Sequence, residues 1–288
     1  MSIISDFDPW RSGLCTCPHK LTFNPYTGCD HACVYCYASS YISRFGDCRP
    51  KKSLVERLKK EVANLNGQTV SISNSSDPYP NVEHELGLTR KCLEILSKAK
   101  CKIQIITKSP VVVRDVDLLK KKPSMVSMTI TTDDDSLAAL LEPNAPSPSE
   151  RLNAVRMLIA NNILTSVRID PIIPSVNESV ESLVDALASV GVQHVTCSTY
   201  KARPDNWRRL SKALPQAAEK LRPLYFEKGE RISGYYYLPR KLRLNLVTKV
   251  RSLAEERGIK FGTCREGLIH LNTGICDGSW LMQADEAS

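Results

Sequence analysis

The chain has 288 residues, enough for one large α/β domain or two small ones. Its hydrophobic content of 42% and charged content of 24% are ordinary for a soluble globular protein, and no apolar run reaches the ~18 residues of a membrane span. The 39 lysines and arginines exceed the 31 acids, which permits contact with nucleic acid but fits a mildly basic enzyme surface equally well. The start of the chain has no basic and apolar leader, so we expect a cytoplasmic protein whose 11 cysteines are reduced, buried or metal-bound.

Taken in chain order, short β-branched runs alternate with longer helical patterns. Strands are predicted at residues 21–24, 69–73, 102–107, 125–131, 164–170 and 193–198. Helices are predicted between them at residues 51–66, 85–100, 112–121, 149–162 and 177–190, with Ser149 capping the fourth and Asn177 starting the fifth. Strands joined in this way by helices are typical of repeated βα units with a parallel sheet.

Two folds have this pattern, a doubly wound sheet and an incomplete barrel. The unusual polar clusters of the chain come directly after predicted strands, where barrels place their active-site loops. We therefore predict an α/β fold, an incomplete (β/α)6 TIM-type barrel of six parallel strands with a C-terminal extension. Its parts are an N-terminal segment (1–20), a barrel core (21–202) and an extension (203–288) that packs on the open side of the barrel.

Three cysteines follow the first predicted strand at short spacing. Cys29, Cys33 and Cys36 form a Cys-x-x-x-Cys-x-x-Cys pattern, so one loop supplies three thiolates. A structural zinc site takes four ligands, and a 4Fe–4S cluster held by protein alone also takes four cysteines. Three would leave one iron without a protein ligand, which favours an enzyme. The alternatives are three merely buried cysteines or part of a zinc knuckle.

This loop, with Tyr35 and Tyr37 on either side of the last cysteine, resembles the cluster loop of radical S-adenosylmethionine (SAM) enzymes. The resemblance is greatest to the spore photoproduct lyase-like, or DNA repair photolyase-like, branch. It extends over roughly residues 21–200 and includes Ser76-Asp77-Pro78-Tyr79-Pro80, Ile106-Thr107-Lys108-Ser109 and Leu141-Glu142-Pro143-Asn144-Ala145-Pro146.

The resemblance implies a 4Fe–4S cluster on Cys29, Cys33 and Cys36, with SAM on the open iron. One electron from a ferredoxin-type or flavodoxin-type reductant would cleave SAM to a 5′-deoxyadenosyl radical, which abstracts hydrogen from substrate. The resemblance and the polar clusters together give these cofactor-binding candidates: Tyr35, Ser73, Asn74, Ser75, Asp77, Lys108, Thr131 and Arg168.

Among these candidates, Lys108 suits the carboxylate of SAM, and the polar stretch after the second strand suits its ammonium. The chain lacks the Gly-Gly-Glu-like stretch that most radical SAM enzymes carry there. Arg168 can reach a carboxylate or ribose, or can form a structural ion pair with Asp170. Tyr37 is a catalytic candidate beside the radical path, and the alternative is that both tyrosines only pack the loop.

Other cysteines suggest further roles. Cys48 is a candidate hydrogen-atom donor because a thiol S–H is weak, and the alternative is a plain loop thiol. If the end of the chain folds back over the barrel, four more thiols meet and can form a closed zinc site or, as we expect from the Cys-x-Cys spacing, a second iron–sulfur cluster. These are Cys15, Cys17, Cys264 and Cys276, and four unrelated thiols are the alternative.

Tyrosines interleave with arginines and lysines over residues 231–243. This pattern is typical of surfaces that stack bases and contact phosphates, and also of an amphipathic strand leading into a helix. The leading hypothesis is a radical SAM enzyme that acts on a nucleic acid. The alternatives are radical SAM modification of a peptide, RNA or small metabolite, and a non-catalytic metal-cluster module that binds nucleic acid.

Overall fold

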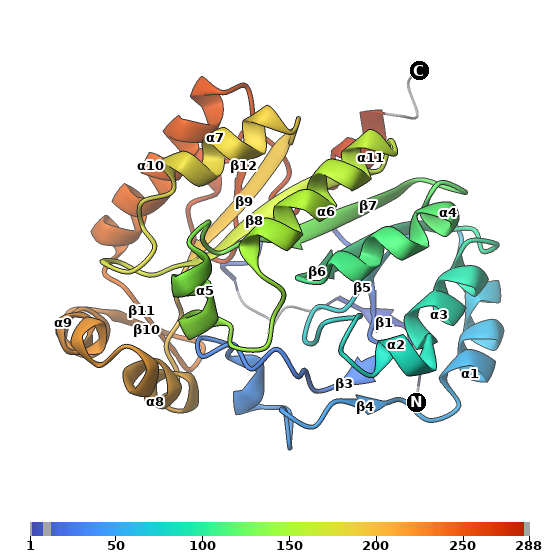
Figure 1. Ribbon diagram of the computed structural model, residues 1–288, viewed down its shortest axis with the longest axis horizontal. Coiled ribbons are helices and arrows are strands. Elements are labelled where there is room, and N and C mark those ends of the chain that lie inside the picture. The colour runs from blue at the N-terminus through green and yellow to red at the C-terminus, as the bar shows by residue number, and fades with distance from the viewer. Residues whose placement is uncertain (1, 8–12, 285–288) are drawn as a thin grey trace.

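The computed structural model describes residues 2–7 and 13–284, and an eight-stranded sheet lies at its centre (Figure 1). From edge to edge the strands are β1 (Ser5–Asp6), β2 (Leu21–Phe23), β5 (Thr69–Ile72), β6 (Lys102–Thr107), β7 (Ser124–Thr129), β8 (Leu164–Ile172), β9 (His194–Thr199) and β12 (Lys260–Thr263). The pairings from β2 to β12 are all parallel, and only β1 pairs antiparallel. Because β1 and β12 are the two ends of the sheet, the barrel is open.

The incomplete barrel predicted from the sequence is confirmed, with all six predicted strands in chain order. The C-terminal extension adds a seventh parallel strand, β12, which pairs with β9. This strand was not predicted, because β12 has only four residues and contains Gly262. Residues 203–288 therefore include a part of the central sheet as well as the helices expected there.

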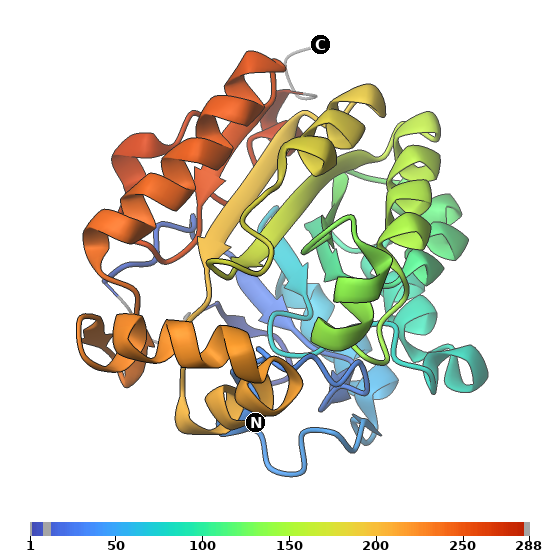
Figure 2. The same ribbon diagram turned by 60° about the vertical axis from the view of Figure 1, so that its left-hand side comes forward.

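Helices cover the outer face of the sheet, as Figures 1 and 2 show. The α-helices are α1 (Leu54–Glu61), α2 (Glu83–Leu86), α3 (Leu88–Leu96), α4 (Val116–Leu119), α5 (Asp135–Leu141), α6 (Pro148–Ala160), α7 (Glu181–Ser189), α8 (Pro204–Ala213), α9 (Pro215–Phe226), α10 (Arg240–Glu256) and α11 (Leu281–Ala284). Short 3₁₀ turns occur at Ala38–Ser40, Val62–Asn64, Pro110–Asp115 and Ile269–Leu271, and two small hairpins are formed by β3 (Tyr26–Thr27) with β4 (Arg49–Pro50) and by β10 (Glu230–Ile232) with β11 (Tyr235–Tyr237).

Two predicted helix starts are wrong. Helix α6 begins at Pro148, and its N-cap is Ser147, which exchanges hydrogen bonds with Glu150 in a capping box, so Ser149 is not the cap. Helix α7 begins at Glu181, because the side chain of Asn177 forms hydrogen bonds within the preceding loop and does not start the helix. Its side-chain oxygen accepts from the N–H of Ile173 at 2.7 Å, and its amide donates to the carbonyl of Thr131 at 2.8 Å.

The tail after β12 lies inside the barrel along the open side. The backbone of Cys276 packs directly on β12, since a Cβ at Gly262 would lie 2.7 Å from the Cα of Cys276. Asp277 forms a buried ion pair with Lys20, the residue before β2. The tail therefore closes the gap between the first and last parallel strands. No helix among the described residues has the length and apolar character needed to cross a bilayer.

Candidate active site

The loop with the three cysteines follows β2 and packs tightly against residues 45–48. The backbone N–H of Cys29 donates to the carbonyl of Phe45 at 2.8 Å. Gly28 has φ of +86°, and a Cβ there would lie 2.6 Å from the carbonyl oxygens of both Phe45 and Asp47. Only glycine fits this position, because it needs both a left-handed backbone and close approach of a second segment.

Side chains from α8 hold the cluster loop from outside. The guanidinium of Arg209 donates to the carbonyl oxygens of Cys33 and Cys36, each at 2.5 Å. The amide of Asn206 donates to the carbonyl of Tyr35 at 2.9 Å. Sequence reasoning missed both α8 residues, because the helix lies 176 residues from Cys33 and no local pattern links the two.

A buried polar network lies behind Tyr35. Its hydroxyl donates to the carboxylate of Glu142 and lies 3.2 Å from the hydroxyl oxygen of Thr131, which itself donates to Glu142 at 2.6 Å. Arg151 forms an ion pair with the other oxygen of Glu142. Burial raises the pKa of Glu142, but the charges of Lys108 and Arg151 outweigh it and hold that pKa below its usual range. Tyr35 and Thr131 therefore use their hydroxyls within the protein.

Lys108 lies between this network and the cluster loop. Its ammonium nitrogen is 4.0 Å from Glu142 and 5.6 Å from the ring centroid of Tyr35. Burial lowers the pKa of Lys108, while the neighbouring Cys33 and Glu142 charges raise it, and the net pKa lies above the usual value. The strand end thus presents a positive charge close to the cysteine loop.

The chain after β5 turns sharply at Ser73, which has φ of +64°, an uncommon value for a residue with a side chain. The hydroxyl of Ser73 is buried without a hydrogen-bond partner among the described residues. Asn74 donates to the hydroxyl of Thr22 at 2.7 Å, and Asp77 accepts from the hydroxyl of Thr107 at 2.8 Å. Asn74 and Asp77 therefore join β5 to its neighbours, and Ser73 offers an uncommitted oxygen.

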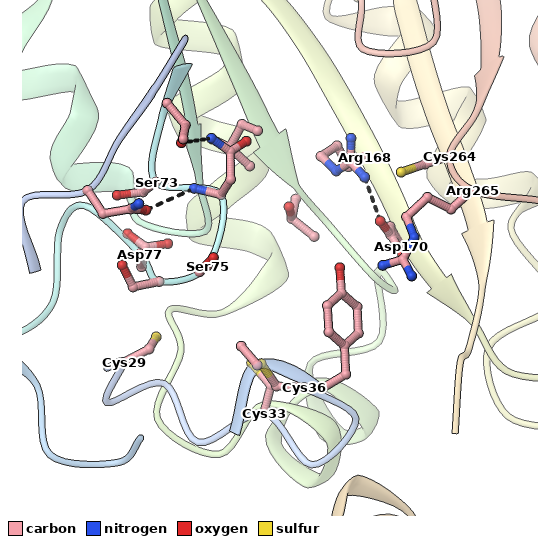
Figure 3. A pocket seen from close by; sticks show the side chains of 18 of the residues that line it. Cys29, Cys33, Cys36, Ser73, Ser75, Asp77, Arg168, Asp170, Cys264 and Arg265 are labelled. Carbon is pink, nitrogen blue, oxygen red and sulfur yellow. Dashed lines mark hydrogen bonds and ion pairs between the residues drawn. The ribbon is translucent and has the colours of Figure 1, made fainter. Parts of the chain in front are cut away.

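These groups border one cavity of about 470 Å³ at the carboxyl ends of the strands. Its lining includes all three loop cysteines and most of the predicted SAM-binding residues: Tyr35, Ser73, Asn74, Ser75, Asp77, Lys108 and Arg168. The predicted catalytic Tyr37 also lines it, whereas the cofactor candidate Thr131 does not. Figure 3 shows the three cysteines on their loop below Ser73, Ser75 and Asp77.

The far side of the cavity carries a second set of charges. Arg168 donates to the carboxylate of Asp170 at 2.6 Å, and Cys264 lies beside this pair (Figure 3). This is the structural ion pair that the sequence left as an alternative for Arg168. Arg265 lies over the ring of Tyr37, with 5.5 Å between the guanidinium carbon and the ring centroid.

The tyrosines of β11 do not form an open stacking surface. Tyr235 and Tyr237 are only 1% and 0% exposed, under the guanidinium groups of Arg203 and Arg243 respectively. The interpretation of this segment as a base-stacking surface is therefore wrong for these two rings. The alternative, an amphipathic strand that leads into α10, is what the structure contains.

Cys48 does not line the cavity. Its thiol donates to the carbonyl of Gly28 at 3.7 Å, on the other side of the cluster loop. Burial, with a smaller effect of the Asp30 charge, raises the pKa of Cys48 to about 12. The role of hydrogen-atom donor stays a prediction for Cys48.

The four remaining predicted ligands come together from distant segments. The sulfur of Cys17 is 3.5 Å from that of Cys276, and Cys15 lies close to Cys17. Cys264 lines the same cavity as Cys15 and Cys17. Among the described residues, however, no three His, Cys, Asp or Glu side chains are already arranged around one point as metal ligands, and this holds for the cluster loop too.

Comparison with known proteins identifies the class. Residues 23–187, more than half of the chain, match the family model of the Radical SAM superfamily. The chain belongs to this superfamily. Membership implies a 4Fe–4S cluster and SAM, as the cysteine spacing predicted.

Individual proteins are similar over different lengths. An uncharacterised protein of Methanocaldococcus jannaschii is 34% identical over 162 residues, which are 54% of this chain and 61% of that protein. The radical SAM Nalpha-GlyT isomerase of Pseudomonas phage M6 is 23% identical to this chain. The aligned part is 84% of this chain and 53% of the isomerase. The chain thus spans less than two thirds of the length of these relatives.

Among solved structures, the fold is similar to that of a spore photoproduct lyase variant with bound AdoMet and dinucleoside spore photoproduct. The TM-score is 0.67 at 16% identity, and the match covers 88% of this chain and 79% of the lyase. At this identity the likeness shows the fold alone.

The residues present fit the cofactors that the superfamily implies. Three cysteines on one loop border the cavity, and the backbone amides of His31 and Asp77 lie close to the sulfur of Cys29, where contacts can tune a cluster sulfur. Burial raises the pKa of Cys33 to about 12, so metal ligation must release its proton. The uncommitted Ser73 hydroxyl and the Lys108 ammonium border the same space.

Proposed function

We propose that this protein is a radical SAM enzyme that cleaves SAM reductively and abstracts hydrogen from a substrate. The observation that carries the proposal is the cavity at the carboxyl ends of the strands. One cavity contains three cysteines of a single loop, a lysine at a strand tip and an unpartnered serine hydroxyl. Bound there, the cluster and SAM supply the one-electron chemistry, and the protein positions them and excludes water.

Each residue of the cavity has a proposed task. Cys29, Cys33 and Cys36 hold the cluster, and Lys108 binds the carboxylate of SAM. The hydroxyl oxygen of Ser73 accepts a hydrogen bond from the ammonium of SAM. The remaining candidates at the end of the same strand line the cavity and shape this contact. They are Asn74, Ser75 and Asp77.

The adenosyl end and the substrate are proposed to lie between Tyr35, which is beside Lys108, and the far side of the cavity at Arg168. Tyr35 offers a ring face, because its hydroxyl is used by Glu142. Tyr37 lies beside the space where hydrogen transfer would occur, with Arg265 over its ring. Arg168, already paired with Asp170, is proposed to contact the ribose.

We infer a nucleic-acid substrate. Support comes from the net charge of +8 and from the fold neighbour, a lyase solved with a dinucleoside photoproduct. Tyr41, at 38% exposure, borders the cavity and can stack against a base at its entrance. A peptide, an RNA or a small metabolite is the competing substrate class.

The proposed setting is the cytoplasm, with a ferredoxin-type or flavodoxin-type protein as electron donor. All 11 cysteines are free, which suits a reducing compartment. The exposed face of the cluster loop, where Ala32 lies on the surface, is a suitable approach for the donor.

The test is anaerobic reconstitution with iron and sulfide, reduction by dithionite, and measurement of 5′-deoxyadenosine by mass spectrometry. We expect 5′-deoxyadenosine from wild type and none from the Cys29→Ala/Cys33→Ala/Cys36→Ala variant. A non-catalytic metal-cluster module predicts none from either protein.

The substrate class is tested in the same assay by adding oligonucleotides, peptides or nucleosides. We expect an oligonucleotide to raise the rate of 5′-deoxyadenosine formation. A deuterated oligonucleotide should transfer deuterium to the 5′-deoxyadenosine. Stimulation by peptides alone would replace nucleic acid with the competing class.

A further inference from the structure

Four thiols outside the proposed reaction form a second group on the open side of the barrel. They come from three segments: the stretch before β2, the residue after β12, and the loop before α11. The group consists of Cys15, Cys17, Cys264 and Cys276, all unpaired. Their neighbours are polar, unlike those of Cys92, Cys101 and Cys197, which belong to the hydrophobic core.

The backbone holds these segments in place. The hydroxyl of Thr196, on β9, donates to the carbonyl of Cys276 at 2.8 Å. The N–H of Cys264 donates to the carbonyl of Cys197 at 2.9 Å. Close packing of Cys276 on Gly262 fixes the distance between β12 and the tail. The four cysteines are therefore neighbours because of the fold, whatever their side chains do.

The side chains already approach one another. The sulfurs of Cys17 and Cys276 are 3.5 Å apart, and Cys15 lies close to Cys17, two residues away in the chain. Cys264 is close enough to interact electrostatically with each of the other three. Ligation by all four requires the thiols of Cys15 and Cys264 to turn toward the Cys17–Cys276 pair.

We propose that Cys15, Cys17, Cys264 and Cys276 bind one zinc ion as a closed, tetrahedral Cys₄ site. Two thiolates on one tetrahedral zinc, each about 2.3 Å from the metal, stand about 3.8 Å apart, close to the observed pair. In a cubane cluster each thiolate binds a different iron, which sets the sulfurs farther apart. The close pair therefore favours a single ion over the second iron–sulfur cluster that the sequence predicted.

The surroundings supply charge for such a site. Arg168 lies close to Cys264, and Lys20 lies close to Cys17. The acids Asp170 and Asp277 pair with these same two cations. Cations beside ligating thiolates stabilise their negative charge. The zinc would join the N-terminal segment, the last strand and the tail across the open side of the barrel.

The experiment measures zinc and iron in the full chain by elemental analysis after purification without added metal. We expect about one zinc ion per chain. The zinc should persist in the Cys29→Ala/Cys33→Ala/Cys36→Ala variant and be lost in Cys17→Ser and in Cys276→Ser. Cys48→Ser is the matched control and should keep the zinc, because this half-buried thiol contacts Gly28 of the cluster loop and is not part of the group of four. Cys15→Ser supplies a further test if Cys276→Ser does not fold.

Three results would overturn the proposal. The first is absence of zinc together with four thiols that react freely in the native protein. The second is iron with sulfide retained in the triple alanine variant, which would replace zinc by a second iron–sulfur cluster. The third is a disulfide between Cys17 and Cys276 in the freshly isolated protein. None of these measurements depends on SAM cleavage, so this proposal and the proposed enzyme activity fail or stand separately.

Discussion

The ammonium of Lys20 lies 2.6 Å from a carboxylate oxygen of Asp277, although the two residues are 257 positions apart in the chain. Both side chains are almost completely buried, at 2% and 4% exposure. Lys20 also donates to the side-chain oxygen of Gln104, on β6, at 2.9 Å. The two ends of the chain are thus joined inside a barrel whose strands do not close.

Lys20→Met is expected to lower the free energy of unfolding by about 3 kcal/mol, because it leaves the carboxylate of Asp277 buried and unpaired. Urea denaturation followed by circular dichroism measures this change. The double variant Lys20→Met/Asp277→Asn is the control, and it should recover part of the loss because no unpaired charge remains. An unchanged unfolding midpoint in the single variant would show that the tail does not depend on this pair.

The same pair predicts an acid-sensitive contribution to stability. Burial raises the pKa of Asp277, but Lys20 outweighs it and holds the pKa below the usual aspartate range. The contribution of Asp277 is therefore present above the unfolded-state pKa, about 4, and is lost as pH falls through the lower, folded-state pKa. The difference in unfolding free energy between wild type and the double variant should shrink in that acidic range. A difference that stays constant down to the lowest accessible pH contradicts the pairing.

The barrel core could be predicted from sequence because its strands are short β-branched runs between periodic helices. The cysteine loop could be predicted because its three ligands are within eight residues of one another. That Lys108 lines the cavity could be predicted for a similar reason, since it stands at the end of a regular strand. In each case the chemistry and the element that positions it are close neighbours in the chain.

The contacts that support the site were not predictable in this way. Arg209 reaches the cluster loop from a helix 176 residues away, and its own helix reads as an ordinary amphipathic segment. Glu142 was expected only to shape a loop, yet it is the acceptor for Tyr35 and the ion-pair partner of Arg151. The sequence also could not show that Cys48 stays out of the cavity lining, because closeness in sequence to the cysteine loop does not determine where a thiol points.

Gly28→Ala is expected to abolish iron incorporation while leaving the rest of the fold in place. The added Cβ would lie 2.6 Å from two backbone oxygens, and the φ of +86° at position 28 disfavours any residue with a side chain. Iron and sulfide content after anaerobic reconstitution gives the measurement. Gly46→Ala is the matched control, because nothing lies within 4 Å of its added Cβ, and it should keep the cluster. Normal iron content in Gly28→Ala would mean that the loop can bind its ligand in another conformation.

Arg209→Ala is expected to make the cluster loop labile. The substitution removes two charge-assisted hydrogen bonds, to the carbonyl oxygens of Cys33 and Cys36, worth about 1.5–3 kcal/mol each in typical cases. We expect the reconstituted cluster to be lost several-fold faster under a chelator, followed by absorbance. Arg208→Ala, at the neighbouring position but with a side chain 78% exposed, should behave as wild type. Equal rates of loss in the two variants would remove Arg209 from the support of the loop.

Lys108→Ala is expected to weaken SAM binding about tenfold or more without bleaching the cluster. The ammonium is the positive charge nearest to the cysteine loop on this strand, and no cysteine is altered by the substitution. Isothermal titration of SAM into the anaerobic, reconstituted protein measures affinity, and the cluster absorbance is read on the same sample. Lys100→Ala, an exposed lysine before the same strand, is the control and should bind as wild type does. Arginine at position 108 keeps the positive charge but not the compact shape of the ammonium. The affinity of Lys108→Arg for SAM should therefore lie between the affinities of wild type and Lys108→Ala. If Lys108→Ala binds SAM as tightly as Lys100→Ala does, the carboxylate is held by another cation, and Arg168 is then the next residue to substitute.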